Sequence, residues 1–122
     1  VAKLKKLAGD DLDIYSGNDD QVIPILSLGG IGVISVLSNV MPAAVHDMVM
    51  KYLNGNIKSA LDIQLKYLDL IEALFCEVNP IPVKAAMKLL GYDVGGLRLP
   101  LTELEDANRA RLKENLEKLK EN

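Results

Sequence analysis

The sequence has little of the chemistry that disulfide or metal sites need. Its 122 residues include one cysteine, one histidine and no tryptophan. Cys76 cannot form an internal disulfide, and it is typical of a small buried side chain in a reducing compartment. Cys76 and His46 together do not supply the three or four ligands of a zinc site, so we expect no bound metal. His46 is expected in the middle of a helix, where a surface or packing role is favoured over catalysis.

Long apolar runs and an excess of positive charge are also lacking. No apolar run approaches the roughly 20 residues that cross a bilayer, and no signal-peptide pattern is present, so we expect no membrane association. The net charge is −3, which argues against nucleic acid as a partner because phosphates require a basic patch. Hydrophobic residues make up 49% of the chain, enough for one modest core.

The chain starts without an initiator methionine and without a helix cap. Leu4, Leu7 and Ala8 nevertheless have helical spacing, and Gly9 is typical of the position after a helix end. The first residues therefore resemble the last two turns of a helix that began earlier. We interpret the chain as part of a larger protein.

Residues 1–55 alternate between helical and strand patterns. The predicted order is helix, strand, helix, strand, helix, with the later four elements at 12–16, 22–28, 32–36 and 42–53. Such alternation is typical of a parallel α/β sheet or barrel. Because two strands alone do not form a stable parallel sheet, we expect the missing strands to precede Val1.

From residue 56 onward the pattern is purely helical. Residues 57–78 predict one long, mostly buried helix, since only a narrow polar stripe interrupts its apolar positions. Pro82 is suited to the first turn of the next helix, which ends near Gly91. Thr102, with Glu105 three residues later, predicts the cap of a last helix.

Ligands of parallel α/β folds bind at the C-terminal ends of the strands. Those ends are expected at residues 16–19 and 36–39. Gly17 lets the backbone approach a ligand, and its amide can bind a carboxylate, although a plain strand-to-helix turn has the same pattern. Lys84 and Lys88 lie four residues apart on a short helix, and nothing marks either as a Schiff-base lysine in a desolvated pocket.

Four motifs resemble one enzyme family. The segment YSGNDD at 15–20, followed by LGGIGVISV at 28–36, resembles the last two barrel strands of the 4-hydroxy-tetrahydrodipicolinate synthases, also called dihydrodipicolinate synthases. The segments NPIPVK at 79–84 and LRLPL at 97–101 are similar to two signatures of that family's C-terminal region. The strand motifs are shared with the wider pyruvate aldolases, whereas the two later signatures are more specific to the synthases.

This resemblance implies a fold and a reaction. The fold is α/β: residues 1–55 are the C-terminal part of a (β/α)8 TIM barrel, its last two strands, and residues 56–122 are an all-helical C-terminal domain. The enzyme is a cytoplasmic, homotetrameric lyase that condenses pyruvate with L-aspartate 4-semialdehyde in lysine and diaminopimelate biosynthesis, without a cofactor. Its Schiff-base lysine and proton-relay residues lie upstream of Val1. We therefore expect no catalytic residue in this chain and no activity from it alone.

The resemblance also implies three substrate-binding positions. Ile34 matches the last-strand isoleucine whose backbone borders the pyruvate pocket, and Gly17 and Asn18 match positions that line the aldehyde side. Asn18 stands where some members of the family have aspartate. Another pyruvate aldolase, such as an N-acetylneuraminate lyase or a keto-deoxy-sugar aldolase, is an alternative. A non-catalytic helical interaction module is a further alternative, suggested by the apolar face of residues 57–78.

Overall fold

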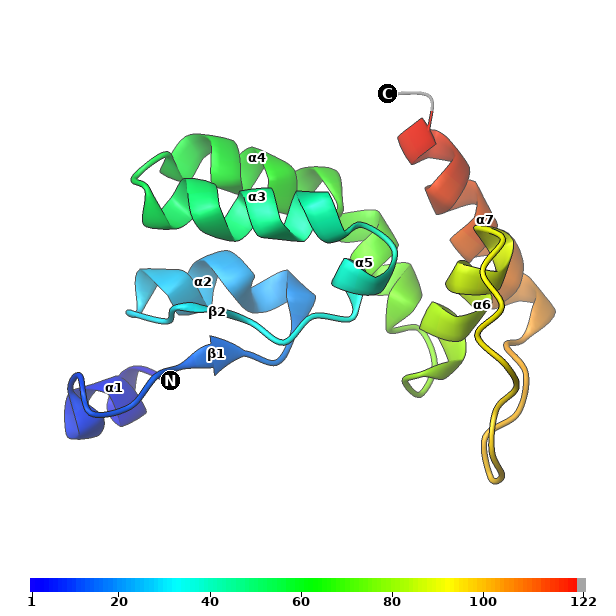
Figure 1. Cartoon of the computed structure of the whole chain (residues 1–122), viewed down its shortest axis with the longest axis horizontal. Coiled ribbons are helices and arrows are strands. Elements are labelled where there is room, and N and C mark those ends of the chain that lie inside the picture. The colour runs from blue at the N-terminus through cyan, green and yellow to red at the C-terminus, as the bar shows by residue number, and fades with distance from the viewer. Residues whose placement is uncertain (121–122) are drawn as a thin grey trace. The chain divides into compact units, whose positions relative to one another are not determined.

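The protein is a helix-rich α/β chain, and the computed structural model describes its residues 1–120 (Figure 1). The chain forms two compact units, Val1–Lys66 and the part from Tyr67 onward. The elements of the first unit are α1 (Ala2–Ala8), β1 (Tyr15–Ser16), the 3-10 turn η1 (Asp19–Gln21), α2 (Val22–Ser27), β2 (Gly32–Val33), the 3-10 turn η2 (Leu37–Asn39), α3 (Pro42–Leu53) and α4 (Ile57–Lys66). Within residues 1–120, no helix is both long and apolar enough to cross a membrane.

The two predicted strands are present and parallel, but each is shorter than its sequence pattern. Tyr15 pairs with Gly32 and Ser16 with Val33, and these two strands make up the sheet of the described residues. Single hydrogen bonds extend the pairing at both ends, from the Ile31 amide to Ile14 and from the Ile34 amide to Ser16. The strands are short because each has only the other as a hydrogen-bonding partner among these residues.

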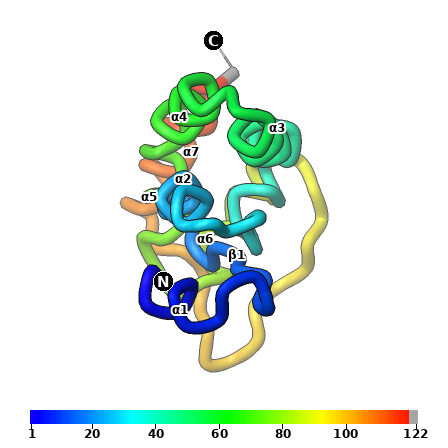
Figure 2. The backbone as a smooth tube through the Cα atoms, turned by 90° about the vertical axis from the view of Figure 1, so that its left-hand side faces the viewer, coloured from blue at the N-terminus to red at the C-terminus, as the bar shows by residue number. Residues whose placement is uncertain are grey.

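Helix α2 lies between the strand pair and the α3–α4 hairpin in both views of the first unit (Figures 1 and 2). Its buried residues Val22 and Leu26 meet Met48 of α3 in the core of this unit. Val45 and Met48 lie three residues apart on one face of α3, and both residues are less than a tenth exposed. The alternation of strands and helices thus places one apolar layer behind the sheet.

The prediction of one long, mostly buried helix over 57–78 is wrong. Helix α4 ends at Lys66, α5 covers Leu68–Leu74, and the boundary between the two compact units falls between them. Ile57 and Leu65 of α4 are 52% and 57% exposed. No glycine or proline marks the break, so the pattern gave no signal for it. Apolar spacing shows which face favours burial, but not whether the described residues provide a partner for that face.

The second unit is a group of packed helices. It consists of α5, α6 (Ile81–Leu89) and α7 (Asp106–Lys120), and each of the three helices contacts the other two. Leu74 of α5, Ala86 of α6 and Leu112 of α7 are fully buried. The predicted helix after Asn79 is confirmed, with Pro82 in its first turn, where proline removes no helical hydrogen bond.

The predicted start of the last helix is wrong. Helix α7 begins at Asp106, and Thr102 lies in the preceding irregular segment with its side chain exposed. The Oε1 atom of Glu77, from the turn before α6, accepts hydrogen bonds from the Glu105 amide at 3.0 Å and from Asn108 Nδ2 at 2.8 Å. A tertiary contact thus supplies the acceptor that the sequence pattern assigned to a local capping box.

Candidate functional site

The C-terminal ends of β1 and β2 bring the three predicted site residues to one edge of the sheet. Gly17 directly follows β1, and Ile34 directly follows β2. Because Ser16 pairs with Val33, Gly17 and Ile34 are the next neighbours in the parallel register. The Ile34 amide donates to the Ser16 carbonyl oxygen at 2.8 Å, which holds the two strand ends together.

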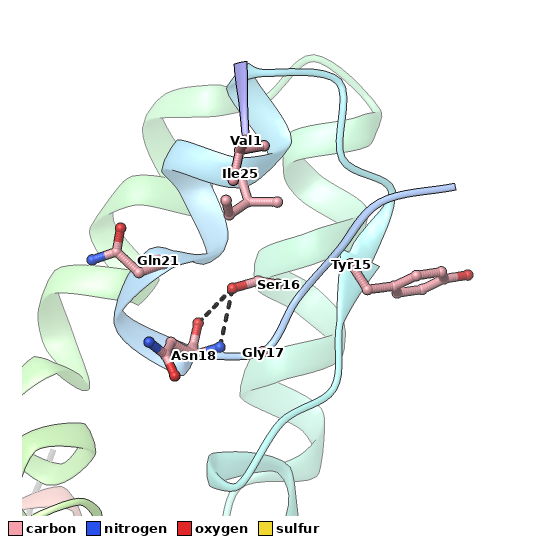
Figure 3. A pocket seen from close by; sticks show the side chains of 7 residues that line it. All are labelled: Val1, Tyr15, Ser16, Gly17, Asn18, Gln21 and Ile25. Carbon is pink, nitrogen blue, oxygen red and sulfur yellow. Dashed lines mark hydrogen bonds between the residues drawn. The ribbon is translucent and has the colours of Figure 1, made fainter. Parts of the chain in front are cut away.

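Side chains alternate between the two faces of this strand pair. Ser16 is 3% exposed, and the half-buried Val33 packs against the core behind the sheet. Tyr15 and Ile34 have the opposite parity and are 51% and 71% exposed. Figure 3 shows Tyr15 pointing away from Ser16. The face that carries Tyr15 and Ile34 is therefore the one that the helices of this unit leave uncovered.

Tyr15 lies against Gly32 on this open face. A Cβ atom at Gly32 would lie 3.0 Å from the Cδ1 and Cε1 atoms of the Tyr15 ring. A larger residue at position 32 would thus displace the ring. In the register, the Tyr15–Gly32 pair lies two residues before Gly17 and Ile34, on the same face of the strand pair.

An open cavity of about 480 Å³ adjoins the end of β1 (Figure 3). Its lining residues are Val1, Tyr15, Ser16, Gly17, Asn18, Gln21 and Ile25. The Ser16 hydroxyl donates to the Asn18 carbonyl at 2.7 Å and accepts from the Asn18 amide at 3.2 Å, which shapes the turn at the cavity wall. The cavity includes Gly17 and Asn18, but Ile34 is not among its lining residues.

The polar side chain with the most hydrogen bonds at this edge is that of Asp19, which was not among the predicted site residues. Asp19 is 1% exposed, and its carboxylate accepts hydrogen bonds from the Ser35 hydroxyl and from the Val36 and Leu37 amides. The signal available in the sequence was an aspartate directly after a strand-end turn. Such a side chain can accept from the amides that begin a neighbouring helical turn.

Gln64 of α4 also contacts this edge, and it was not among the predicted site residues. Its side chain is 4% exposed, its Nε2 donates to the Asp19 carbonyl at 2.8 Å, and its Oε1 accepts from the Ile23 amide at 2.9 Å. Two hydrogen bonds satisfy this buried amide, which would otherwise destabilise the fold. In sequence it lies 45 residues from Asp19, so local patterns carry no sign of the pairing.

The remaining candidate residues lie outside this edge. His46 is on the exposed side of α3, as expected. Lys84 donates to the Gly96 carbonyl, and Lys88 lies 3.7 Å from a Glu103 carboxylate oxygen. Cys76 is half-buried, and burial raises the pKa of its thiol. Residues 1–120 contain no cluster of three or more metal-ligating side chains.

Comparison with known proteins identifies the relatives of this chain. Residues 1–119 match the sequence profile of the "Dihydrodipicolinate synthetase family". The 4-hydroxy-tetrahydrodipicolinate synthase of Clostridium tetani is 59% identical over 116 residues, which are 95% of this chain and 40% of that enzyme. The chain thus spans about two fifths of the length of the curated relatives that it matches.

Solved structures agree with this relationship. The dihydrodipicolinate synthase from Aquifex aeolicus superposes with a TM-score of 0.93 at 39% identity, over 98% of this chain and 41% of that one. The dihydrodipicolinate synthase from Acinetobacter baumannii, solved as a chloride-inhibited complex with pyruvate, gives 0.89 at 34% identity, over 95% of this chain and 40% of that one. The resemblance inferred from the four sequence motifs is confirmed.

Proposed function

Because this chain belongs to the dihydrodipicolinate synthetase family, we propose that it forms the C-terminal part of a 4-hydroxy-tetrahydrodipicolinate synthase. The complete enzyme condenses pyruvate with L-aspartate 4-semialdehyde in lysine biosynthesis. The observation that carries this proposal is the identity of 59% to such a synthase over 95% of the chain. The pyruvate complex of the Acinetobacter baumannii relative supports pyruvate as one substrate.

In this proposal, residues 1–55 supply the last two strands of a (β/α)8 barrel, and residues 56–122 form the helical C-terminal domain. The parallel pair β1–β2, joined through α2, has the order of two consecutive barrel units. Helix α4 then packs back onto α3, so that the first compact unit extends beyond the proposed boundary.

The open face of the strand pair becomes part of the barrel interior in this arrangement. The main chain of Ile34 borders the pyruvate pocket, and Gly17 and Asn18 line the side where the aldehyde binds. Two observations support these roles. Gly17 and Ile34 are neighbours in the register, and beyond Gly17 and its two chain neighbours no atom lies within 4 Å of a Cβ built at Gly17, so a substrate can approach its backbone.

The Schiff-base lysine and the proton-relay side chains lie in the part of the enzyme that precedes this chain. Enamine formation requires an amine in a desolvated pocket with an acid–base group beside it. Lys84 and Lys88 contact a backbone carbonyl and a glutamate in the helical unit instead. We therefore propose that residues 1–122 alone have no aldolase activity. A cytoplasmic homotetramer remains the prediction for the complete enzyme.

Borohydride trapping of the full-length protein with pyruvate tests this assignment. We expect a stable pyruvyl adduct on a lysine that precedes Val1, together with turnover of pyruvate and L-aspartate 4-semialdehyde. Turnover of sialic acid or a keto-deoxy sugar in place of the semialdehyde would instead assign another pyruvate aldolase. An adduct on Lys84, Lys88 or any other lysine of residues 1–122 would show that the active site is misplaced.

A further inference from the structure

The Asp19 carboxylate connects the two turns that carry the proposed substrate contacts. One oxygen, Oδ1, accepts the hydroxyl hydrogen of Ser35. The other, Oδ2, accepts from the Val36 and Leu37 amides at 2.9 Å each. Asp19 is 1% exposed, so these three bonds replace the solvation that its carboxylate would have in water.

The position of this carboxylate in the chain relates it to the proposed site. Asp19 directly follows the Gly17–Asn18 pair, and its partner Ser35 directly follows Ile34. At the end of the strands, the Ile34 amide also donates to the Ser16 carbonyl. The two strand ends are therefore joined twice, by a backbone hydrogen bond and by the Asp19 side chain one turn further on.

Gln64 restrains Asp19 from the helical side. Its amide group donates to the Asp19 carbonyl oxygen at 2.8 Å, so both the main chain and the side chain of Asp19 are held. Charge-assisted hydrogen bonds to a buried carboxylate are stronger than those between neutral groups. Asp19 thus has the contacts of a rigid connection between the two turns.

We propose that Asp19 is a positioning residue of the pyruvate site. Its carboxylate sets the separation between the Gly17–Asn18 turn and the Ile34 main chain without touching the substrate. The proposal rests on the function assigned above. A shift of about 1 Å at a reacting centre can cost about a hundredfold in rate, so a connection of this kind affects catalysis as well as folding.

Three variants of the full-length protein separate positioning from stability. Asp19→Asn keeps the side-chain shape but replaces one acceptor oxygen with a donor group. Ser35→Ala is milder, because both amide donors to Asp19 remain. Met48→Ala is the stability control, since Met48 is a buried core residue on α3 and belongs to neither strand-end turn. Melting temperatures, KM for pyruvate, KM for the semialdehyde and kcat are measured well below each melting temperature.

We expect Asp19→Asn to raise the KM for pyruvate by about tenfold or more, and Ser35→Ala to raise it by about threefold. Met48→Ala should lower the melting temperature while both KM values stay within about twofold of the parent. If Asp19→Asn does not fold, Ser35→Ala decides the question. A KM for pyruvate that is unchanged in the folded Asp19 or Ser35 variants overturns the proposal, as does an equal rise in Met48→Ala.

The same experiment distinguishes this inference from the proposed function. If the parent forms a borohydride-trapped pyruvyl adduct but does not use the semialdehyde, the synthase assignment fails. The concentration of pyruvate at half-maximal trapping then tests Asp19 in any pyruvate aldolase, with the same expected shifts. A parent that forms no pyruvyl adduct overturns both.

Discussion

At the scale of single residues, Gly30 shows how closely the chain after α2 approaches that helix. A Cβ atom there would lie 2.6 Å from Ile25 Cγ2 and 2.8 Å from the Ile25 carbonyl oxygen. We predict that Gly30→Ala lowers the free energy of unfolding of the full-length protein by about 1–3 kcal/mol, because backbone atoms must move. Urea unfolding measures this loss. Gly96→Ala is the control, since no atom beyond its two chain neighbours lies within 4 Å of its Cβ position, and an equal loss there would contradict the explanation.

The thiol of Cys76 provides a second residue-scale prediction. Burial, and then the charge of Glu77, raise the pKa of this thiol above its usual value. Since the thiolate is the reactive form, we predict slower reaction with a disulfide reagent at pH 8 in the folded than in the denatured protein. The folded-state rate should climb as the pH rises towards the raised pKa. Equal rates in both states at every pH would contradict this prediction.

The raised pKa of the Cys76 thiol also determines how the stability of the protein depends on pH. A raised folded-state pKa means that the folded protein favours the neutral thiol. The resulting contribution to the free energy of unfolding is fully present below the ordinary thiol pKa, and it is lost as the pH rises through the pKa of the folded protein. Cys76→Ser removes this pH dependence and serves as the control.

At the scale of elements, Glu77 determines how α7 begins. Its Oε1 accepts from the Glu105 amide and from Asn108 Nδ2, and no local side chain provides these bonds at the start of α7 within the described residues. We predict that Glu77→Ala lowers the free energy of unfolding by about 0.5–2 kcal/mol, the range for a lost helix cap. Thermal unfolding of the full-length protein measures the change.

Thr102→Ala is the matched control for this prediction. The sequence pattern assigns the cap to Thr102, whereas the structure leaves this side chain exposed and four residues before the helix. Its removal should change stability by less than about 0.5 kcal/mol. A larger loss in the free energy of unfolding for Thr102→Ala than for Glu77→Ala would support the local capping box instead of the Glu77 contact.

At the scale of the whole molecule, exposed apolar residues affect the stability and self-association of the chain when it is produced alone. Ile34 is 71% exposed on the strand pair, and Leu65 is 57% exposed on α4. Short parallel strands with unpaired edges also invite association. We predict that residues 1–122, produced alone, are marginally stable or oligomeric. Light scattering across a range of concentrations measures the mass.

A monodisperse monomer with cooperative unfolding would contradict that prediction. Specific binding of such a monomer to an unrelated partner would favour a helical interaction module instead. The full-length protein is the control, because the proposed barrel covers the open face of β1 and β2. Its hydrogen exchange at Ile34 should be slower than that of the isolated chain, since further strands and substrate contacts protect the strand ends.

The order of the elements up to α3 and the family both follow from patterns within short stretches of the sequence. Alternating apolar and polar residues placed β1, a short apolar run placed β2, and helical apolar spacing placed α2 and α3, because these patterns depend only on which side chains are near in the chain. The end of β1 lies within the predicted residues 16–19, whereas β2 ends at Val33, before the predicted residues 36–39. The parallel register makes Gly17 and Ile34 neighbours. Their roles as substrate contacts stay predictions, to be tested in the complete enzyme.

Contacts between residues far apart in the chain became visible only in the folded structure. Three features depend on segments that are distant in the sequence, so short-range patterns do not predict them. They are the break between α4 and α5, the Glu77 acceptor before α7, and the hydrogen-bond partners of Asp19. An aspartate after a turn favours amide donors, but the local pattern does not tell which amides it meets. The donors are those of Val36 and Leu37, 17 and 18 residues away, because parallel pairing brings the end of β2 beside the end of β1.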